Sequence, residues 1–183
     1  MRRRVLSAIV MALSMAYGWA ATAWAVTETT TLSRVEGVRI EQPSMIVYLP
    51  LASSGPPVDR LKTVLAEPAT WNPTDLVLED IRFDAPPGVL FDMFLSIPGR
   101  EVDRQYVGTL SLAEPERSRT FEVALKLKKL RNERSELPEL QLMFEASLGT
   151  DDPTLTFKDA QERFNREAGL RVGSVVLRVR DEP

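Results

Sequence analysis

Apolar and polar residues alternate along much of the chain, and the pattern is clearest between residues 75 and 112. Three segments there show the alternation that is typical of half-buried β-strands: 76–83, 89–97 and 106–112. Two turn-forming segments separate them. We therefore expect three consecutive strands, with 89–97 as a half-buried central strand of a sheet.

Two local features interrupt this alternation. The step from Asp80 to Ile81 breaks the period of two and predicts a bulge in the first strand. Further on, Pro86 and Pro87 have no N–H to donate to a sheet, and Gly88 favours a backbone turn. The chain is therefore predicted to reverse direction before the second strand begins.

The second strand carries two phenylalanines that cannot both face the core. Phe91 and Phe94 are an odd number of positions apart, so a regular strand points them to opposite sides. Phe91 shares its side with Val89, Met93 and Leu95, which is the more apolar set, and we predict that Phe91 faces inward. The other expected core residues are Leu110, Phe121, Val123 and Leu142.

The remaining elements are predicted from the same patterns. A long connection over 51–72 has room for a short helical turn at 60–66. Helical composition over 158–168 begins with Asp159 as an early acid and stops at Gly169. The other predicted strands are 38–49, interrupted at Pro43, then 120–128, 140–146 and 172–179.

These elements predict an all-β fold. Strands spaced by turns, without alternation of strands and helices, are typical of an antiparallel β-sandwich or jelly roll. We expect about seven strands, with one short helix near the C-terminus.

The first 25 residues have the order of a secretory signal peptide. Three arginines at positions 2–4 precede an apolar run over about 5–16, and Ala23-Trp24-Ala25 forms a small-residue cleavage site. The apolar run is short for a membrane span, so a retained anchor is the less favoured alternative. We expect a periplasmic or secreted protein without a membrane span after cleavage, followed by a flexible leader over 26–37 (or an edge strand over its first part) and a single domain over 38–183.

Composition excludes several classes of function. The formal net charge of −3 becomes −6 once the three arginines are removed, which argues against binding to nucleic acid. The chain contains no cysteine, so its core must hold the fold without disulfides. It also contains no histidine, which rules out histidine-ligated zinc or copper and histidine-dependent triads within this chain.

Carboxylates are the remaining catalytic candidates, and no spacing singles out a pair for acid–base chemistry. Asp92 differs from the others because it lies between Phe91 and Met93 in the predicted central strand. Asp151, Asp152 and Asp159 could hold Ca²⁺, but their spacing does not match an EF-hand loop. We expect no enzyme activity and no cofactor. The other carboxylates considered are Glu79, Asp80, Asp84, Glu101 and Asp103.

A family resemblance is carried by the central strands. Leu90-Phe91-Asp92-Met93 resembles the Lys-Phe-Asp-Val signature of the C-terminal domain of plant polyphenol oxidases. Around it, segments at 76–81, 86–89, 95–98 and 106–111 resemble, in order and spacing, the C-terminal region of bacterial tyrosinase-type proteins. The similarity extends over roughly 38–179. Leu90 stands where that family has lysine, and Ser96 where it usually has asparagine.

The resemblance implies a β-sandwich that covers a copper domain. The histidine-rich copper domain itself is missing, and a type-3 copper centre needs six histidines, so this chain does not oxidise phenols itself. The implied role is a shield, chaperone or subunit for a separate type-3 copper oxidase. The alternative is an envelope or secreted binding module that is unrelated to any oxidase, because a shared fold does not imply a shared function.

The loop over 98–106 is the predicted partner-facing edge. It is polar and charged, too long for a tight hairpin, and ends in an aromatic residue. Loops held by a rigid sandwich are where binding residues gather. The candidate partner-facing residues are Arg100, Arg104 and Tyr106, with packing against the sandwich as the alternative role of Tyr106.

Overall fold

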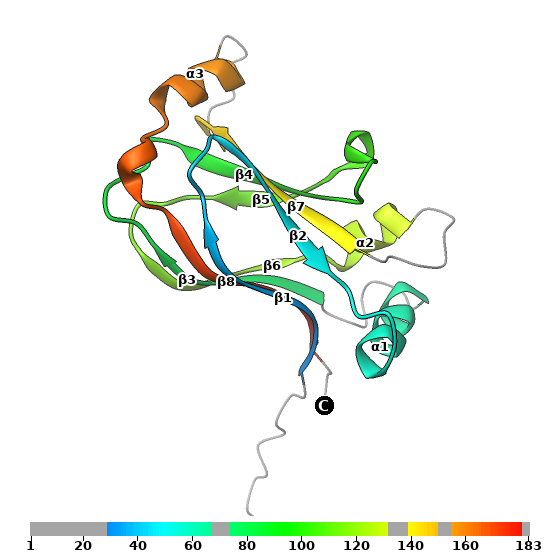
Figure 1. The fold of residues 1–183 in the computed structure, drawn as a ribbon. Coiled ribbons are helices and arrows are strands. Elements are labelled where there is room, and N and C mark those ends of the chain that lie inside the picture. Colours follow the sequence, from blue (N-terminus) through cyan, green and yellow to red (C-terminus); the bar gives the residue numbers. More distant parts are fainter. Residues whose placement is uncertain (1–28, 67–73, 132–138, 150–154, 181–183) are drawn as a thin grey trace, which may run out of the picture.

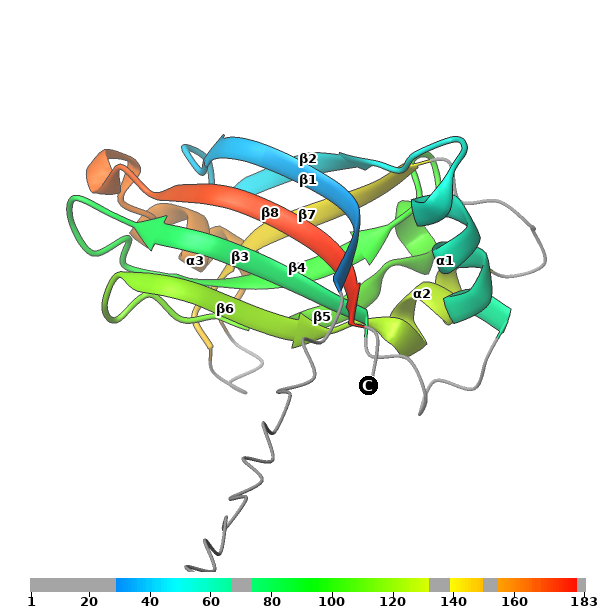
Figure 2. The same ribbon diagram turned by 90° about the horizontal axis from the view of Figure 1, so that it is seen from below.

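Two antiparallel four-stranded sheets face each other in the computed structural model of this chain (Figure 1). The structure describes residues 29–66, 74–131, 139–149 and 155–180. The predicted all-β sandwich is confirmed, with eight strands in the described ranges rather than about seven. Figure 2 shows the first sheet from its outer face, with the second sheet behind it.

The order of strands within each sheet brings distant parts of the sequence together. The first sheet runs β1 (Thr29–Arg39), β8 (Arg171–Arg180), β3 (Thr74–Arg82) and β6 (Glu116–Glu122). The second sheet runs β2 (Ser44–Pro50), β7 (Glu139–Ser147), β4 (Leu90–Ser96) and β5 (Gln105–Leu110). The strand that was expected to be central, β4, is indeed an inner strand.

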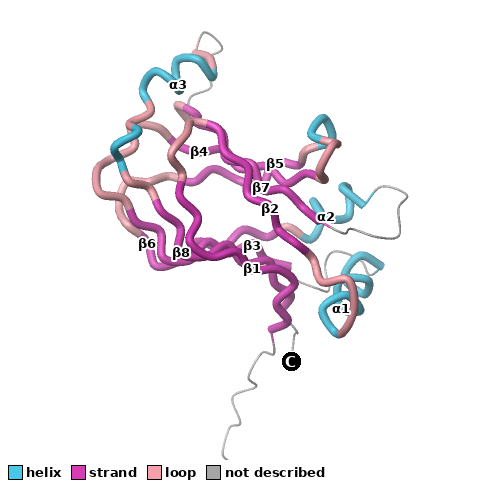
Figure 3. The backbone as a smooth tube through the Cα atoms, in the orientation of Figure 1, coloured by secondary structure: helices cyan, strands magenta, loops and turns pink. Residues whose placement is uncertain are grey.

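The described helices lie at the two ends of the sandwich, leaving the sheet faces uncovered by helix (Figure 3). Helices α1 (Pro56–Ala66) and α2 (Ala124–Arg131) contact each other at one end. Helix α3 (Phe157–Arg163) and a 3₁₀ turn, η2 (Arg166–Ala168), lie at the other end. A second 3₁₀ turn, η1 (Glu101–Asp103), is part of the β4–β5 loop. None of the helices in the described ranges has the length and apolar character that crossing a bilayer requires.

Phe91 lies in the centre of the core, as parity predicted. Its side chain is fully buried, and its ring makes edge contacts with Phe144 at 6.5 Å and Phe164 at 5.9 Å between centroids. Phe94 points to the outer face of the same strand and is only partly buried. Of the other expected core residues, only Phe121 is partly rather than fully buried; Val89, Leu95, Leu110, Val123 and Leu142 are buried.

The predicted leader was wrong over most of its length. Residues 29–37 belong to β1, which pairs with β8 as the edge strand of the first sheet. Leu32, Val35 and Val38 turn toward the core from this strand, so its threonine-rich sequence still has an apolar side. The domain therefore begins before residue 38, and the alternative of an edge strand was the better one.

The predicted opening strand over 38–49 is two strands in different sheets. β1 ends at Arg39 and β2 begins at Ser44, with Pro43 in the connection between them. The Pro43 carbonyl accepts a hydrogen bond from the Ala146 N–H at 2.7 Å. The proline therefore marks the point at which the chain crosses from one sheet to the other.

The predicted strand over 120–128 was wrong in its second half. β6 ends at Glu122, and helix α2 follows, burying Ala124, Leu127 and Leu130 while leaving Leu125 exposed. Leucine and lysine alternate briefly here, which fits a strand, but every residue of α2 is a good helix former and none is β-branched. Spacings of three residues between the buried positions show that the helical period prevails.

The expected irregularity in β3 lies at Asp80. Its backbone φ is +53°, which is the left-handed region that non-glycine residues rarely adopt. Leu78 and Ile81 both face the core although they are three positions apart, because Asp80 reverses the alternation. The pairing of β3 with β6 and with β8 keeps its register across this position, so the feature is a local twist and not the predicted bulge with an extra residue.

The helix predicted over 158–168 is divided into α3 and η2. Asp159 accepts hydrogen bonds from the Thr156 N–H at 2.6 Å and the Thr156 hydroxyl at 2.7 Å, and these hold its pKa below the ordinary value. Gly169 ends the segment in the left-handed conformation, as expected. Two predictions lie outside the described residues: the signal peptide over 1–25 and the acids Asp151 and Asp152.

Candidate functional site

The β4–β5 loop is held in one shape by its own polar groups. The Arg100 N–H donates to the Ile97 carbonyl at 2.9 Å, and the Gly99 N–H donates to the Glu101 carboxylate at 3.0 Å. The Arg100 guanidinium binds the Asp103 carboxylate, with Nε at 3.0 Å from Oδ2. Arg100 therefore stabilises the loop itself, while Val102 in the same loop is 95% exposed.

Arg104 leaves this loop and lies on the outer face of the second sheet. The central carbon of its guanidinium lies 4.1 Å from the centre of the Phe94 ring, which is within cation–π distance. The same guanidinium forms an ion pair with Glu145 on the neighbouring strand β7. Arg104 thus connects an aromatic ring and a carboxylate across three strands.

Tyr106 packs against the same ring. The two ring centroids of Phe94 and Tyr106 are 5.6 Å apart, and the Tyr106 hydroxyl lies 2.6 Å from the Thr109 hydroxyl. Thr109 in turn donates to Asp92. A register shift between Met93 and Phe94 places Tyr106 and Thr109 on one face although they are three positions apart. Packing was one of the two roles predicted for Tyr106, and its ring does pack against Phe94. About half of the residue (51%) nevertheless remains exposed.

Four apolar side chains form a row across the outer face of the second sheet. Strand pairing aligns Ile46 with Met143, Met143 with Phe94, and Phe94 with Tyr106. Tyr48 is the next outward-facing residue of β2 after Ile46, and it is 52% exposed. We refer to these five residues as the outer patch. Tyr106 belongs to the outer patch and Arg104 lies beside it, against Phe94, whereas Arg100 is engaged within its own loop.

Sequence reasoning missed the other members of the outer patch. Alternation over 44–50 does show that Ile46 and Tyr48 share a side. The pattern cannot reveal that this side faces solvent, because both sides of the strand are apolar. Nor can it reveal that β2 and β5, which are far apart in sequence, are the two edges of one sheet.

The outer face of the first sheet is different in character. Arg34 forms ion pairs with Glu36 and with Glu79, the latter at 3.0 Å. The Ser174 hydroxyl donates to Glu79 at 2.6 Å, and this hydrogen bond, helped by Arg34, holds the pKa of Glu79 below its ordinary value. Arg180 pairs with the buried Asp75 at 2.8 Å. Several charged side chains on this face therefore pair with one another.

Each candidate carboxylate that the structure describes has a partner. Asp80 pairs with Arg82 at 2.6 Å, and Asp84 pairs with Arg171 at 2.7 Å. Asp92 accepts the hydrogen bond from Thr109, while Glu101 and Asp103 brace the β4–β5 loop. Within the described ranges there is no group of three or more acidic side chains placed to hold a metal ion. The described acids thus act as local structural partners.

Comparison with known proteins adds no assignment to this geometry. No protein-family model matches the chain, and no curated protein matches it in sequence. The class that the fold defines is an all-β, sandwich-like protein of two antiparallel four-stranded sheets.

Proposed function

We propose that this chain is an exported, non-catalytic module that binds a separate type-3 copper oxidase and acts as its shield, chaperone or subunit. The observation that carries the proposal is the outer patch. It presents apolar and aromatic side chains to solvent on one sheet, while the outer face of the other sheet carries several ion pairs. Exposed apolar patches with a polar surround mark surfaces that bind other proteins.

The composition of the outer patch supports protein binding. Tyrosine, methionine and arginine are enriched at the centres of protein interfaces, and tyrosine has few rotatable bonds to immobilise. Here Tyr106, Phe94 and Arg104 hold one another before any partner arrives. A surface that is ordered in advance loses less conformational entropy on binding.

The identity of the partner rests on the sequence resemblance to the covering domain of polyphenol oxidases. Export rests on the signal-peptide pattern of residues 1–25. The loop over 98–106 adjoins the outer patch, so Arg104 and Tyr106 are the loop residues that belong to the proposed interface. Arg100 is assigned to maintaining the loop.

A binding and activity experiment tests this proposal. Protein lacking residues 1–25 is mixed with a copper oxidase domain that lacks its own covering domain, and complex formation and phenol oxidation are both measured. We expect the wild-type protein to bind and to change the oxidase activity. Tyr106→Ala and Arg104→Ala should each weaken binding about tenfold or more, as expected of residues at the centre of an interface.

Two controls make the result decisive. Thr120→Ala changes an exposed residue on the outer face of the first sheet and should leave binding unchanged. Arg100→Ala separates a loop effect from a direct contact. If all variants bind as wild type does, the outer patch is not the interface; if wild type neither binds nor changes the activity, the role as an oxidase partner is wrong for that enzyme.

A further inference from the structure

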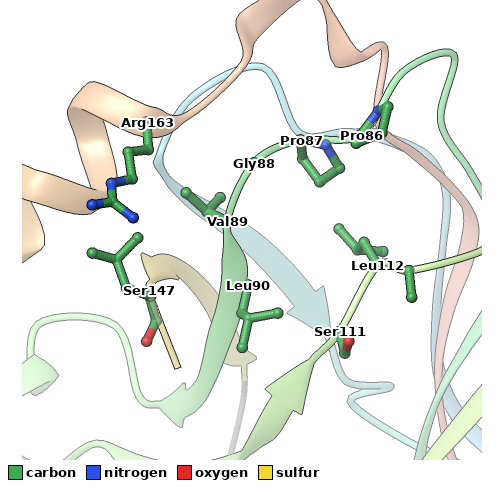
Figure 4. A pocket seen from close by; sticks show the side chains of 11 residues that line it. Pro86, Pro87, Gly88, Val89, Leu90, Ser111, Leu112, Ser147 and Arg163 are labelled. Atoms are coloured by element: carbon green, nitrogen blue, oxygen red, sulfur yellow. The ribbon is translucent and has the colours of Figure 1, made fainter. Parts of the chain in front are cut away.

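A separate pocket lies beside α3 (Figure 4). Helix α3 is at the end of the sandwich away from the β4–β5 loop (Figure 1). It has a volume of about 410 Å³, which is within the range of small-molecule sites. Its apolar walls come from the turn before β4, the segment after β5 and the end of β7: Pro87, Val89, Leu112 and Leu148.

One wall of this pocket is built rigidly. The Asn165 N–H donates to the Pro87 carbonyl at 2.9 Å, and the Asn165 side-chain amide donates to the Pro86 carbonyl at 3.3 Å. Gly88 adopts a φ of +77°, and a Cβ atom there would lie 2.6 Å from the Arg163 carbonyl oxygen. The turn and the end of α3 are therefore in direct backbone contact. They form a fixed wall of the pocket before any ligand binds.

A single cation reaches into this pocket. The Arg163 side chain extends from α3 toward Ser147 at the end of β7 (Figure 4). Other charged groups of α3 have partners: Lys158 with Glu162 at 3.9 Å, and Asp159 with Thr156. Across the described residues, Arg163 forms no ion pair and donates no side-chain hydrogen bond. Pocket walls that combine apolar and polar surface thus meet one guanidinium that forms no ion pair within the described residues.

We infer that this pocket binds a small amphipathic carboxylate, with its apolar part against Val89, Leu112 and Leu148 and its carboxylate on Arg163. A guanidinium presents parallel N–H donors that match the two oxygens of a carboxylate. Ser111 is exposed at the pocket and lies on the other side of Leu90 from Arg163, so the carboxylate is assigned to Arg163 alone (Figure 4). Apolar walls with a few converging polar groups are the usual composition of a small-molecule site.

Titration with octanoate, followed by amide chemical shifts in NMR spectra, tests this inference. We expect octanoate to shift the amides of Val89, Leu90 and Leu148 in a saturable way. Octanamide, which has the same chain without the charge, should bind about tenfold more weakly. Arg163→Gln should lower the affinity for octanoate by a similar factor, because a charged hydrogen bond is lost.

Arg166→Gln is the matched control, because Arg166 is an exposed arginine in η2 that does not line the pocket. It should bind octanoate as wild type does, and the same spectra verify that each variant is folded. Equal affinity of wild type and Arg163→Gln, equal affinity for octanoate and octanamide, or the absence of saturable shifts would each overturn the inference. None of these outcomes bears on the oxidase partner, which is assigned to the outer patch.

Discussion

At the scale of single residues, Phe91 lies where three aromatic rings meet in the core. It is fully buried and touches the rings of Phe144 on β7 and Phe164 after α3. We expect Phe91→Ala to lower the free energy of unfolding by about 3–5 kcal/mol, because apolar transfer energy is lost and a cavity remains. Urea titration measures this change. Phe94→Ala, three positions along the same strand but on the outer face, is the control and should cost less than half as much.

The contrast between these two phenylalanines also shows what a residue-level pattern can predict. Their odd spacing predicts that the two side chains lie on opposite sides of the strand, and the more apolar neighbours of Phe91 correctly identified its side as the inner one. The exposed role of Phe94 could not be predicted in detail, because it depends on Arg104 and Tyr106 arriving from another strand. Should Phe91→Ala and Phe94→Ala prove equally stable, the inward placement of Phe91 would be wrong.

At the scale of elements, the contact between the turn before β4 and α3 depends on Gly88. An alanine there meets two obstacles: the left-handed φ, which costs about 1–2 kcal/mol, and the backbone oxygen of Arg163 at 2.6 Å. Gly99 has nearly the same φ, +76°, but open space around its missing Cβ. We expect Gly88→Ala to destabilise the protein clearly more than Gly99→Ala does. Urea unfolding of both variants measures the difference. If both variants lose the same free energy of unfolding, α3 can move away from the turn without destabilising the protein.

Helix α2 shows where element-level reasoning from sequence fails. Alternating leucine and lysine fits a strand over a few residues, and only the longer spacing of Ala124, Leu127 and Leu130 fits a helix. The N–H of Val123 bonds to the Thr74 carbonyl at 2.8 Å, and the chain then turns away from the sheet. Tertiary packing of the apolar face against the end of the sandwich decides between the two periods.

At the scale of the whole molecule, both sheets share one continuous hydrophobic core. We expect urea unfolding to be a single cooperative transition, because separating the sheets would expose the inner faces of both. Far-UV circular dichroism reports the backbone. In protein that lacks residues 1–25 and carries Trp71→Phe, the near-UV tyrosine signal comes from Tyr48 and Tyr106 and reports the second sheet. The two curves should coincide. Two separate transitions would mean that the sheets unfold as independent units.

The sequence by itself determined the class of fold and the inner side of the central strand. Period-two alternation and proline–glycine turns depend only on local backbone geometry, so they can be recognised without the fold. The early acid of α3, Asp159, and the stop at Gly169 are local in the same way.

Only the tertiary structure decided which surfaces meet and which stay exposed. The outer patch needs β2, β7, β4 and β5 to be adjacent, and the pocket at α3 needs Arg163 beside the Pro86–Gly88 turn. The partner of β1 is β8, at the far end of the described chain. The physical reason is that pairing between sheets and strands distant in sequence is set by burial of the whole core, which no local pattern encodes.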